Sequence, residues 1–256
     1  KQQIKGVLFS MRVTAIKTRV VEVGSCDVTE LLAESFKEVP ERSVIAITSK
    51  VVSLCEGNAL PKSDYTKDEL IEKEADLFIP RTENKYGVYL TIKNNTLVPT
   101  AGIDESNTNG HFVLWPKDPQ RSANRCWEFV RNHFGIRHVG IILTDSISSP
   151  MRLGVTGRSI AYCGFKPINS RVGHTDLFGK PLKQTRINVA DALAASAVLV
   201  MGESDEQTPV VLIEDVPFVV FSDQEPTTEE LNTWKVRMED DLYAHLLTRM
   251  DWKKKD

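Results

Sequence analysis

Three short acidic segments, each next to an apolar run, hold the residues whose types could do chemistry. Asp104 lies in TAGIDESNTNG, Asp145 in LTDS and Glu203 in MGESDEQT. An acid at the end of a buried strand can direct its carboxylate into a cleft. Carboxylates that converge repel one another unless a divalent cation, which prefers oxygen ligands, lies between them. Because such cations commonly also bind nucleotide phosphates, the three segments together predict a metal-dependent nucleotide site.

Each acidic segment also has a plainer interpretation when it is taken alone. An acid that follows a strand often closes an Asx turn or caps a helix. The segment around Gly202 could simply connect a helix to a strand. One sequence does not reveal which residues meet in space, so the shared site is a hypothesis at this stage.

The elements that must position these acids can be recognised from apolar runs and capping residues. VGIILT (139–144) has the pattern of a buried strand and leads to Asp145. SVIAIT (43–48) is a second buried strand, which ends at Ser49, and residues 188–201 form an Ala-rich helix that leads to the third acidic segment. Further strands are expected over residues 12–23, 86–92, 96–100, 159–165, 209–213 and 217–221.

Helix starts are indicated by capping residues. Asp27 with Glu30, and Thr66 with Glu69, have the spacing of a capping box. The second box predicts a helix over residues 67–77. Two further helices are expected, one over residues 119–134 that ends at Gly135 and a long terminal one that begins at Thr227, and residues 166–185 are expected to form a long loop. The apolar positions of the terminal helix recur at helical spacing and are Leu231, Trp234, Met238, Leu242 and Leu246.

Helices and strands alternate without a regular βαβ rhythm, and no GxGxxG or GxxxxGK[ST] motif is present. We therefore expect an α+β fold with irregular mixed sheets and packed helices rather than a Rossmann sheet. Met11 has the position of a natural start, so residues 1–10 are interpreted as an extension. Residues 11–256 are expected to form a single unit, with two intertwined subdomains as the alternative.

Composition limits the class of protein. The chain has 256 residues, a formal net charge of −3 and 41% hydrophobic residues. It lacks the basic excess of a nucleic-acid binder and has no apolar run long enough to span a bilayer. The opening residues have too few apolar side chains for a signal peptide, and the four cysteines form no CxxC pair. We expect a cytoplasmic protein with neither nucleic-acid nor membrane partners.

Six segments together resemble the family of coenzyme F420-0:γ-glutamyl ligases. They are ITSKVVSLCEG, TAGIDESN, VGIILTDS, HTDLFGKPL, VADALAASAVLVMGE and TPVVLI, and the resemblance runs from about Arg12 to Ile213. It implies a ligase that joins L-glutamate to an acceptor carboxylate, with GTP as the energy source. It also implies an unusual α+β fold whose two subunits intertwine as a homodimer.

The same resemblance implies roles for individual residues. Asp104 and Asp145 would be the catalytic metal ligands, and Ser146, where the family usually has threonine, would add a hydroxyl ligand. Glu203 would hold a second Mg²⁺ or Mn²⁺ ion. The residues that would line the nucleotide site are Ser49, Lys50, Asn107, Met201, Gly202, Glu203, Ser204, Asp205, Glu206, Gln207 and Thr208.

This chemistry requires no protein nucleophile. A carboxylate cannot acylate an amine directly because oxide is a poor leaving group, whereas an acyl phosphate made with the γ-phosphoryl group has a good one. Metal ions neutralise the phosphate oxygens and hold the reactants in line. The sequence accordingly has neither a Ser-His-Asp nor a Cys-His signature.

The chain departs from the family pattern in two places. Leu54 stands where family members often have a lysine, for which Lys50 is a substitute candidate. Ser148, Ser149 and Met151 replace a Gly-Arg pair and an aromatic residue. A lost arginine removes bidentate recognition of an anionic acceptor. Coenzyme F420-0 is therefore the default acceptor, with tetrahydrofolate as the alternative.

Two readings of another class remain open. The first is a catalytically silent protein that binds nucleotide or metal on the same scaffold, and the second is a phosphatase-like metal hydrolase. Further candidates for binding substrate carboxylates are Arg152, Arg158 and Arg171. His174, in a Gly-containing polar loop, is a candidate for a residue that faces the substrate. Trp115, like the other three tryptophans, is most simply a core or interface residue.

Overall fold

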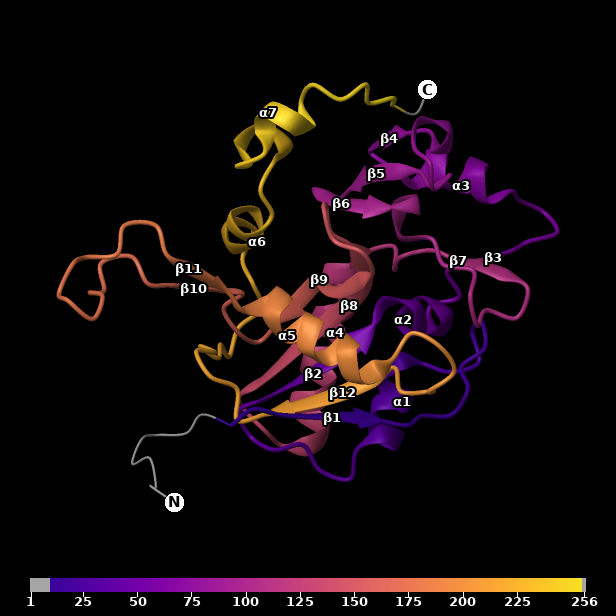
Figure 1. Cartoon of the computed structure of the whole chain (residues 1–256). Coiled ribbons are helices and arrows are strands. Elements are labelled where there is room, and N and C mark those ends of the chain that lie inside the picture. The colour runs from indigo at the N-terminus through magenta and orange to yellow at the C-terminus, as the bar shows by residue number, and fades with distance from the viewer. Residues whose placement is uncertain (1–9, 255–256) are drawn as a thin grey trace, which may run out of the picture.

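The computed structural model describes residues 10–254, and its centre is a five-stranded mixed sheet (Figure 1). Strands β2 and β8 run parallel at its middle, and the other neighbouring strands pair antiparallel. The predicted strands at 43–48 and 139–144 are therefore confirmed as the buried centre. In spatial order the strands are β1 (Arg12–Ile16), β12 (Val210–Glu214), β2 (Ser43–Thr48), β8 (Val139–Ser148) and β9 (Val155–Cys163).

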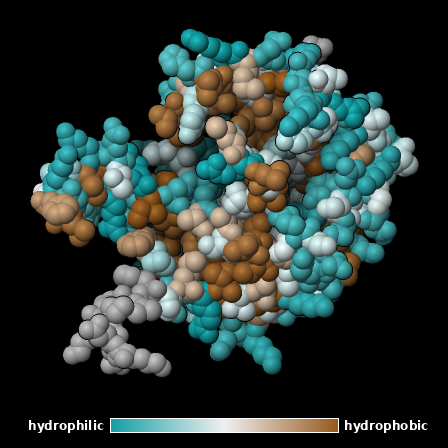
Figure 2. Space-filling model, viewed as in Figure 1, coloured by the Kyte–Doolittle hydropathy of each residue, from teal (hydrophilic) through white to brown (hydrophobic). Residues whose placement is uncertain are grey.

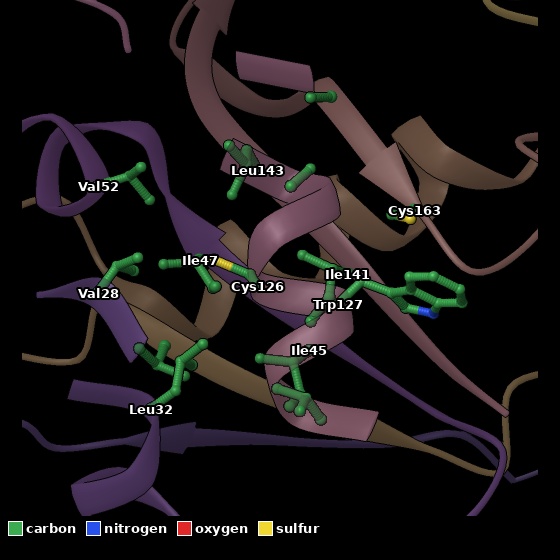
Figure 3. Packing of buried hydrophobic residues seen from close by; sticks show 14 of the residues in the cluster. Val28, Leu32, Ile45, Ile47, Val52, Cys126, Trp127, Ile141, Leu143 and Cys163 are labelled. Carbon is green, nitrogen blue, oxygen red and sulfur yellow. The ribbon is translucent and has the colours of Figure 1, made fainter. Parts of the chain in front are cut away.

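Helices cover both faces of this sheet, because residues of β2 alternate between two cores. Ile45 and Ile47 pack with α4 (Pro119–Phe134) and α1 (Val28–Ser35), as Figure 3 shows. Val44 and Ala46 pack on the opposite face with α5 (Val189–Met201). The face that carries α5 has apolar surface between polar regions (Figure 2), and Leu199 of that helix is 83% exposed.

A smaller lobe stands beside the sheet and has a core of its own. The turn at Asn94 and Asn95, both with positive φ, connects two paired strands as predicted. The elements of the smaller lobe are β3 (Ala59–Pro61), α3 (Lys67–Glu74), β4 (Leu77–Ile79), the 3-10 helices η1 (Arg81–Glu83) and η2 (Thr100–Gly102), β5 (Leu90–Lys93), β6 (Thr96–Pro99) and β7 (His111–Val113). The predicted start of α3 is confirmed, with both bonds of the capping box formed.

The long terminal helix is the clearest wrong prediction. The chain instead forms α6 (Thr228–Trp234), the 3-10 helix η3 (Met238–Asp240) and α7 (Ala244–Leu247). Leu231 and Trp234 pack against the core on the α5 side, whereas Leu242 and Leu246 are 89% and 68% exposed. The helical spacing of the apolar residues is real, but only the first turns have a surface to pack against, and a short helix without tertiary packing is marginal.

Three strand predictions are also too long. The first strand ends at Ile16 instead of residue 23, and the strand expected over residues 86–92 begins only at Leu90. Residues 217–221 contribute only an isolated bridge between Phe165 and Phe221. Within the predicted loop, the three residues of β10 (Ile168–Ser170) pair with β11 (Arg186–Asn188), so residues 168–188 form a hairpin that projects from the body (Figure 1).

The fold class is confirmed as mixed α+β. The homodimer and the assignment of residues 11–256 to one unit stay predictions. The predicted extension over residues 1–10 lies outside the described residues except for Ser10. Within residues 10–254, every helix is too short or too polar to cross a bilayer.

Candidate functional site

A cavity of about 700 Å³ lies where the sheet meets the smaller lobe. Topology explains its position. Because β2 and β8 are parallel, Ser49, which follows β2, and Asp145, just past the last β2–β8 pair, lie at the same sheet edge, although β8 itself continues to Ser148, beyond the predicted end at residue 144. β12 is antiparallel to β2 and begins at that edge, with Val210 opposite Ile47, so the connection from α5 to β12 also lies there. The central sheet thus supplies much of the cavity lining, and the segment after β1 and the loop after β6 complete it.

Asp145 is a half-buried carboxylate at the base of the cavity. Its Oδ2 accepts a hydrogen bond from Trp115 Nε1 at 2.7 Å, and its Oδ1 accepts one from the Ser146 amide at 2.9 Å. Burial raises the pKa of Asp145 to about 7, against the effect of these two hydrogen bonds, and the nearby charge of Asp104 adds to the increase. The Lys50 ammonium also lowers this pKa, but it pairs directly with Asp104, so the negative charge of Asp145 is only partly compensated.

Asp104 faces the same cavity from the loop after β6 and has a different environment. Lys50 Nζ lies 2.6 Å from its Oδ2, and the amide and hydroxyl of Ser106 donate to its Oδ1 at 2.8 and 2.9 Å. Although burial opposes the effect, the Lys50 ammonium and the Ser106 donors hold the pKa of Asp104 below its usual range. Asp104 is therefore ionised and already paired.

Glu203 lies in the loop between α5 and β12, and its Oε1 accepts a hydrogen bond from Ser146 Oγ at 2.5 Å. Gly202 allows this turn, because it has φ +77° and an added Cβ would lie 2.3 Å from Glu206 Cδ. The loop is closed by Thr208 Oγ1, which donates to the Met201 carbonyl at 2.7 Å. These contacts hold Glu203 beside the end of β8.

All the residues predicted to bind metal or nucleotide line this one cavity. They are Ser49, Lys50, Asp104, Asn107, Asp145, Ser146 and the complete loop Met201, Gly202, Glu203, Ser204, Asp205, Glu206, Gln207 and Thr208. Asn107 Nδ2 donates to the Ser204 carbonyl at 2.6 Å and so connects two walls. The spatial convergence that the sequence could not reveal is present, while the role of each residue stays a prediction.

The arginine and histidine candidates are not among the residues that line the cavity. Arg158 lies 3.7 Å from Asp191 on α5, and His174 and Arg171 are on the projecting hairpin. Sequence reasoning also missed Trp115, whose indole contacts Asp145 directly. Its sequence context carries no signal for this role.

The donor set suits a hard divalent cation, since the side chains are carboxylate and hydroxyl oxygens without sulfur or imidazole. Among residues 10–254, no three Asp, Glu, His or Cys side chains are close enough to form a metal site by themselves. This arrangement fits Mg²⁺, which typically binds one or two carboxylates together with substrate phosphates rather than a complete protein cage. Asp104 with Asp145, and Ser146 with Glu203, are the two oxygen pairs available.

Comparison with known proteins assigns the family. The family model described as F420-0:Gamma-glutamyl ligase matches residues 15–215. The chain is 35% identical to the coenzyme F420:L-glutamate ligase of Methanopyrus kandleri over 204 residues, which is 73% of this chain and 79% of the relative. It is 33% identical over 234 residues to the protein of the same name from Methanococcus maripaludis, covering 85% and 91% of the two chains. The chain therefore belongs to the F420-0:γ-glutamyl ligase family.

Proposed function

We propose that this protein is a GTP-dependent ligase that adds L-glutamate through an amide bond to an acceptor carboxylate, with coenzyme F420-0 as the first acceptor. The observation that carries the proposal is the single cavity lined by Asp104, Asp145 and Glu203. Lys50 and the loop 201–208 border the same space. Similarity to proteins named coenzyme F420:L-glutamate ligase supports the reaction and the acceptor.

The nucleotide triphosphate is the ligand that best uses these groups. Lys50 has its ammonium at the start of α2 (Ser49–Cys55), where it can bind phosphate oxygens once Asp104 has another cationic partner. Asn107 and the loop 201–208 would enclose the nucleotide from the opposite side. The cavity volume of about 700 Å³ is within the range of small-molecule sites.

Two Mg²⁺ or Mn²⁺ ions would neutralise triphosphate oxygens, one held by Asp104 and Asp145 and the other by Ser146 and Glu203. The protein groups hold and orient the reactants and need no covalent intermediate on a side chain. Because burial disfavours the charged form of Asp145, this carboxylate would gain from a bound cation. Lys50 stays close to the developing negative charge of the phosphoryl group.

The reaction proceeds in two balanced steps. The acceptor carboxylate attacks the γ-phosphorus of GTP, and GDP leaves, which gives an acyl phosphate. The uncharged amine of L-glutamate then attacks the acyl carbon, loses a proton to form the amide, and inorganic phosphate leaves. Positioning of the reactants and electrostatic stabilisation supply the rate enhancement.

The identity of the acceptor is the part of the proposal on which this chain's departures from the family pattern bear most directly. Ser148 lines the cavity, while Met151 is 95% exposed at the turn after β8. This turn has no arginine where the family pattern would offer one to an anionic acceptor. A folate with a terminal glutamate carboxylate is the second acceptor to test, because its γ-linkage is the same.

One mass-spectrometric assay tests the reaction and the acceptor together. The protein is incubated with GTP, Mn²⁺ or Mg²⁺, L-glutamate and either F420-0 or tetrahydrofolate. We expect F420-0 to gain one or more glutamyl units, with one GDP formed per unit. If product forms with tetrahydrofolate and not with F420-0, the proposed acceptor is wrong, whereas the proposed ligase reaction stands.

Other outcomes would contradict the ligase assignment. Nucleotide binding without turnover on either acceptor would favour a silent binding protein. Phosphate release that does not depend on glutamate would favour a hydrolase. Substituting ATP for GTP in parallel reactions determines the nucleotide, and sedimentation of the same sample tests the proposed homodimer.

A further inference from the structure

Trp115 lies between the two aspartates that face the cavity, although neither its sequence context nor the proposed reaction assigns it a role. Its indole Nε1 donates to Asp145 Oδ2 at 2.7 Å. Two residues earlier in the chain, Val113 forms two backbone hydrogen bonds with Asp104, each 2.9 Å long. The short segment 113–115 is therefore tied by hydrogen bonds to both carboxylate-bearing residues, one in the smaller lobe and one at the end of β8.

The loop that carries Asp104 is shaped around this indole. Thr100, Ala101 and Gly102 are consecutive residues with positive φ of 54°, 53° and 70°. A Cβ on Gly102 would lie 2.1 Å from Trp115 Nε1, so only glycine leaves room for the ring. Non-glycine residues in this left-handed region are strained and persist where the surrounding structure holds them there. The strained segment leads directly through Ile103 to Asp104.

Other contacts hold the tryptophan in one orientation. Its side chain is buried, with the residue 3% exposed, and its carbonyl accepts a hydrogen bond from Asn58 Nδ2 at 2.6 Å. Lys93 Nζ lies 5.7 Å from the ring centroid. Because the ring cannot turn freely, its N–H group has a fixed direction, which points to Asp145.

We propose that Trp115 is a positioning residue that fixes the Asp145 carboxylate relative to Asp104 for divalent-cation binding, an inference that rests on the proposed function. Hydrogen-bond partners of metal-binding carboxylates orient the ligand and tune its affinity for the metal. Trp115 does this across the junction of the sheet and the smaller lobe. It contacts no reacting atom and acts only through Asp145.

A second tryptophan supplies a matched control. Trp127 on α4 is 4% exposed, belongs to the same core as Trp115, and donates from Nε1 to the Val139 carbonyl at 3.0 Å. It also packs against a glycine, Gly164, where an added Cβ would lie 2.2 Å from its Nε1. The two indoles thus match in burial, donor use and crowding, and differ in whether the acceptor is a cavity carboxylate.

The test compares Trp115→Phe with Trp127→Phe in the full chain. Binding of Mn²⁺ alone is followed by the electron paramagnetic resonance signal of the free ion, and folding by circular dichroism and melting temperature. We expect Trp115→Phe to weaken Mn²⁺ binding by about tenfold or more. Trp127→Phe should leave Mn²⁺ binding unchanged, although it should lower the melting temperature about as much as Trp115→Phe does. Wild-type affinity in Trp115→Phe, or equal weakening in both variants, would overturn the inference.

A shape-preserving replacement decides the outcome if Trp115→Phe does not fold. Benzothienylalanine, incorporated at position 115 by codon suppression, keeps the bicyclic shape and replaces the N–H group with sulfur. It should weaken Mn²⁺ binding as Trp115→Phe does, and unchanged affinity would contradict the proposal. If the wild-type protein itself binds no Mn²⁺ at millimolar concentration, the metal assignment is wrong and the role of Trp115 falls with it. If the wild-type protein binds Mn²⁺ and removal of the N–H group does not change the affinity, only the proposed role of Trp115 is refuted and the metal assignment stands.

Discussion

Strand β8 and the loop after β6 each bring one aspartate to the same cavity, yet their surroundings shift the pKa of the carboxyl group in opposite directions. Asp104, on the loop, has the Lys50 ammonium at 2.6 Å and a lowered pKa. Asp145, on the strand, has only neutral donors and a pKa raised to about 7 by burial. The difference indicates that Lys50 pairs directly with Asp104, whereas its charge acts on Asp145 without an ion pair.

This asymmetry suggests a division of work between rigid and adjustable parts. Leu143 and Ile147, on either side of Asp145 in β8, are buried in the main core, so the backbone at Asp145 is held in place. Lys50 has a 26% exposed side chain on the cavity wall and can exchange Asp104 for phosphate oxygens when a cation binds. Under the proposed function, the partly compensated charge of Asp145 would favour cation binding, and the Lys50–Asp104 pair would be the part that rearranges.

The largest expected effect is the loss of activity in Asp145→Ala. The substitution removes the carboxylate with the strongest demand for a cation, and we expect metal-dependent turnover to fall by about 10³-fold or more, since a metal's electrostatic stabilisation is worth several kcal/mol. Circular dichroism should show an intact fold. Asp64→Ala, which changes an exposed loop aspartate outside the cavity lining, is the control and should retain full activity. Undiminished turnover in Asp145→Ala would remove the metal assignment.

A smaller effect is expected from Lys50→Met, which leaves Asp104 without its cation. Hydrogen bonds to charged groups contribute about 1.5–3 kcal/mol, so we expect kcat/KM for GTP to fall by about 10- to 100-fold. The matched control is Lys62→Met, because Lys62 contacts Glu105 in the same loop at 3.7 Å but does not line the cavity. Equal kinetic losses in the two variants would refute a specific role for Lys50.

The positions of Asp145 and Glu203 were predictable from the sequence because strong local signals precede them. The apolar run before Asp145 and the helix before Glu203 are long enough to identify, and the ends of β2, β8 and α5 meet at one sheet edge. Convergence follows from the pairing of β2 with β8, which no local pattern encodes. The acids could be named from the sequence, while their electrostatic difference required the structure.

The features that the sequence did not reveal depend on contacts between distant residues. Trp115 meets Asp145 across 30 positions of sequence, and nothing near either residue marks the bond. The terminal segment has helical periodicity up to Leu246, but its longest helix, α6, ends at Trp234, which packs on Tyr162, and only short helical turns follow. Periodicity indicates which face a helix would bury and says nothing about whether a surface is there to receive it.

Ser146 tests whether the second oxygen pair is as important as the first. Its hydroxyl donates to Glu203 Oε1 at 2.5 Å. We expect Ser146→Ala to lower kcat/KM by about tenfold, consistent with one hydrogen bond or ligand of about 1.4 kcal/mol. Ser146→Thr keeps the hydroxyl and should retain nearly full activity. Similar activity of the two variants would indicate that the hydroxyl group has no catalytic role.

The most modest effects are expected in stability, where the two aspartates should respond with opposite signs. In chelator-treated protein, the pKa of Asp145 is raised from 3.8, the value taken for the unfolded chain, to about 7 in the folded protein. Asp145 therefore ionises more readily in the unfolded chain. Its ionisation therefore destabilises the fold increasingly as pH rises from 3.8 to 7. Asp145→Asn should stabilise the protein, and by no more than about 2 kcal/mol because the amide loses one of the two acceptor bonds.

Asp104 has the reverse linkage, because its folded pKa lies below the unfolded value. Its stabilising contribution is complete above the unfolded pKa and is lost only as pH falls through the folded one. Asp104→Asn should cost about 1 kcal/mol or less, since the Lys50 pair is partly exposed, and the cost should be equal at about pH 5 and about pH 8. Urea unfolding at these two values separates the residues, because only the gain from Asp145→Asn should increase with pH. A pH-independent gain, or a loss, in that variant would mean that the Asp145 carboxylate is better compensated than its neutral neighbours imply, and the comparison between the two aspartates would fail.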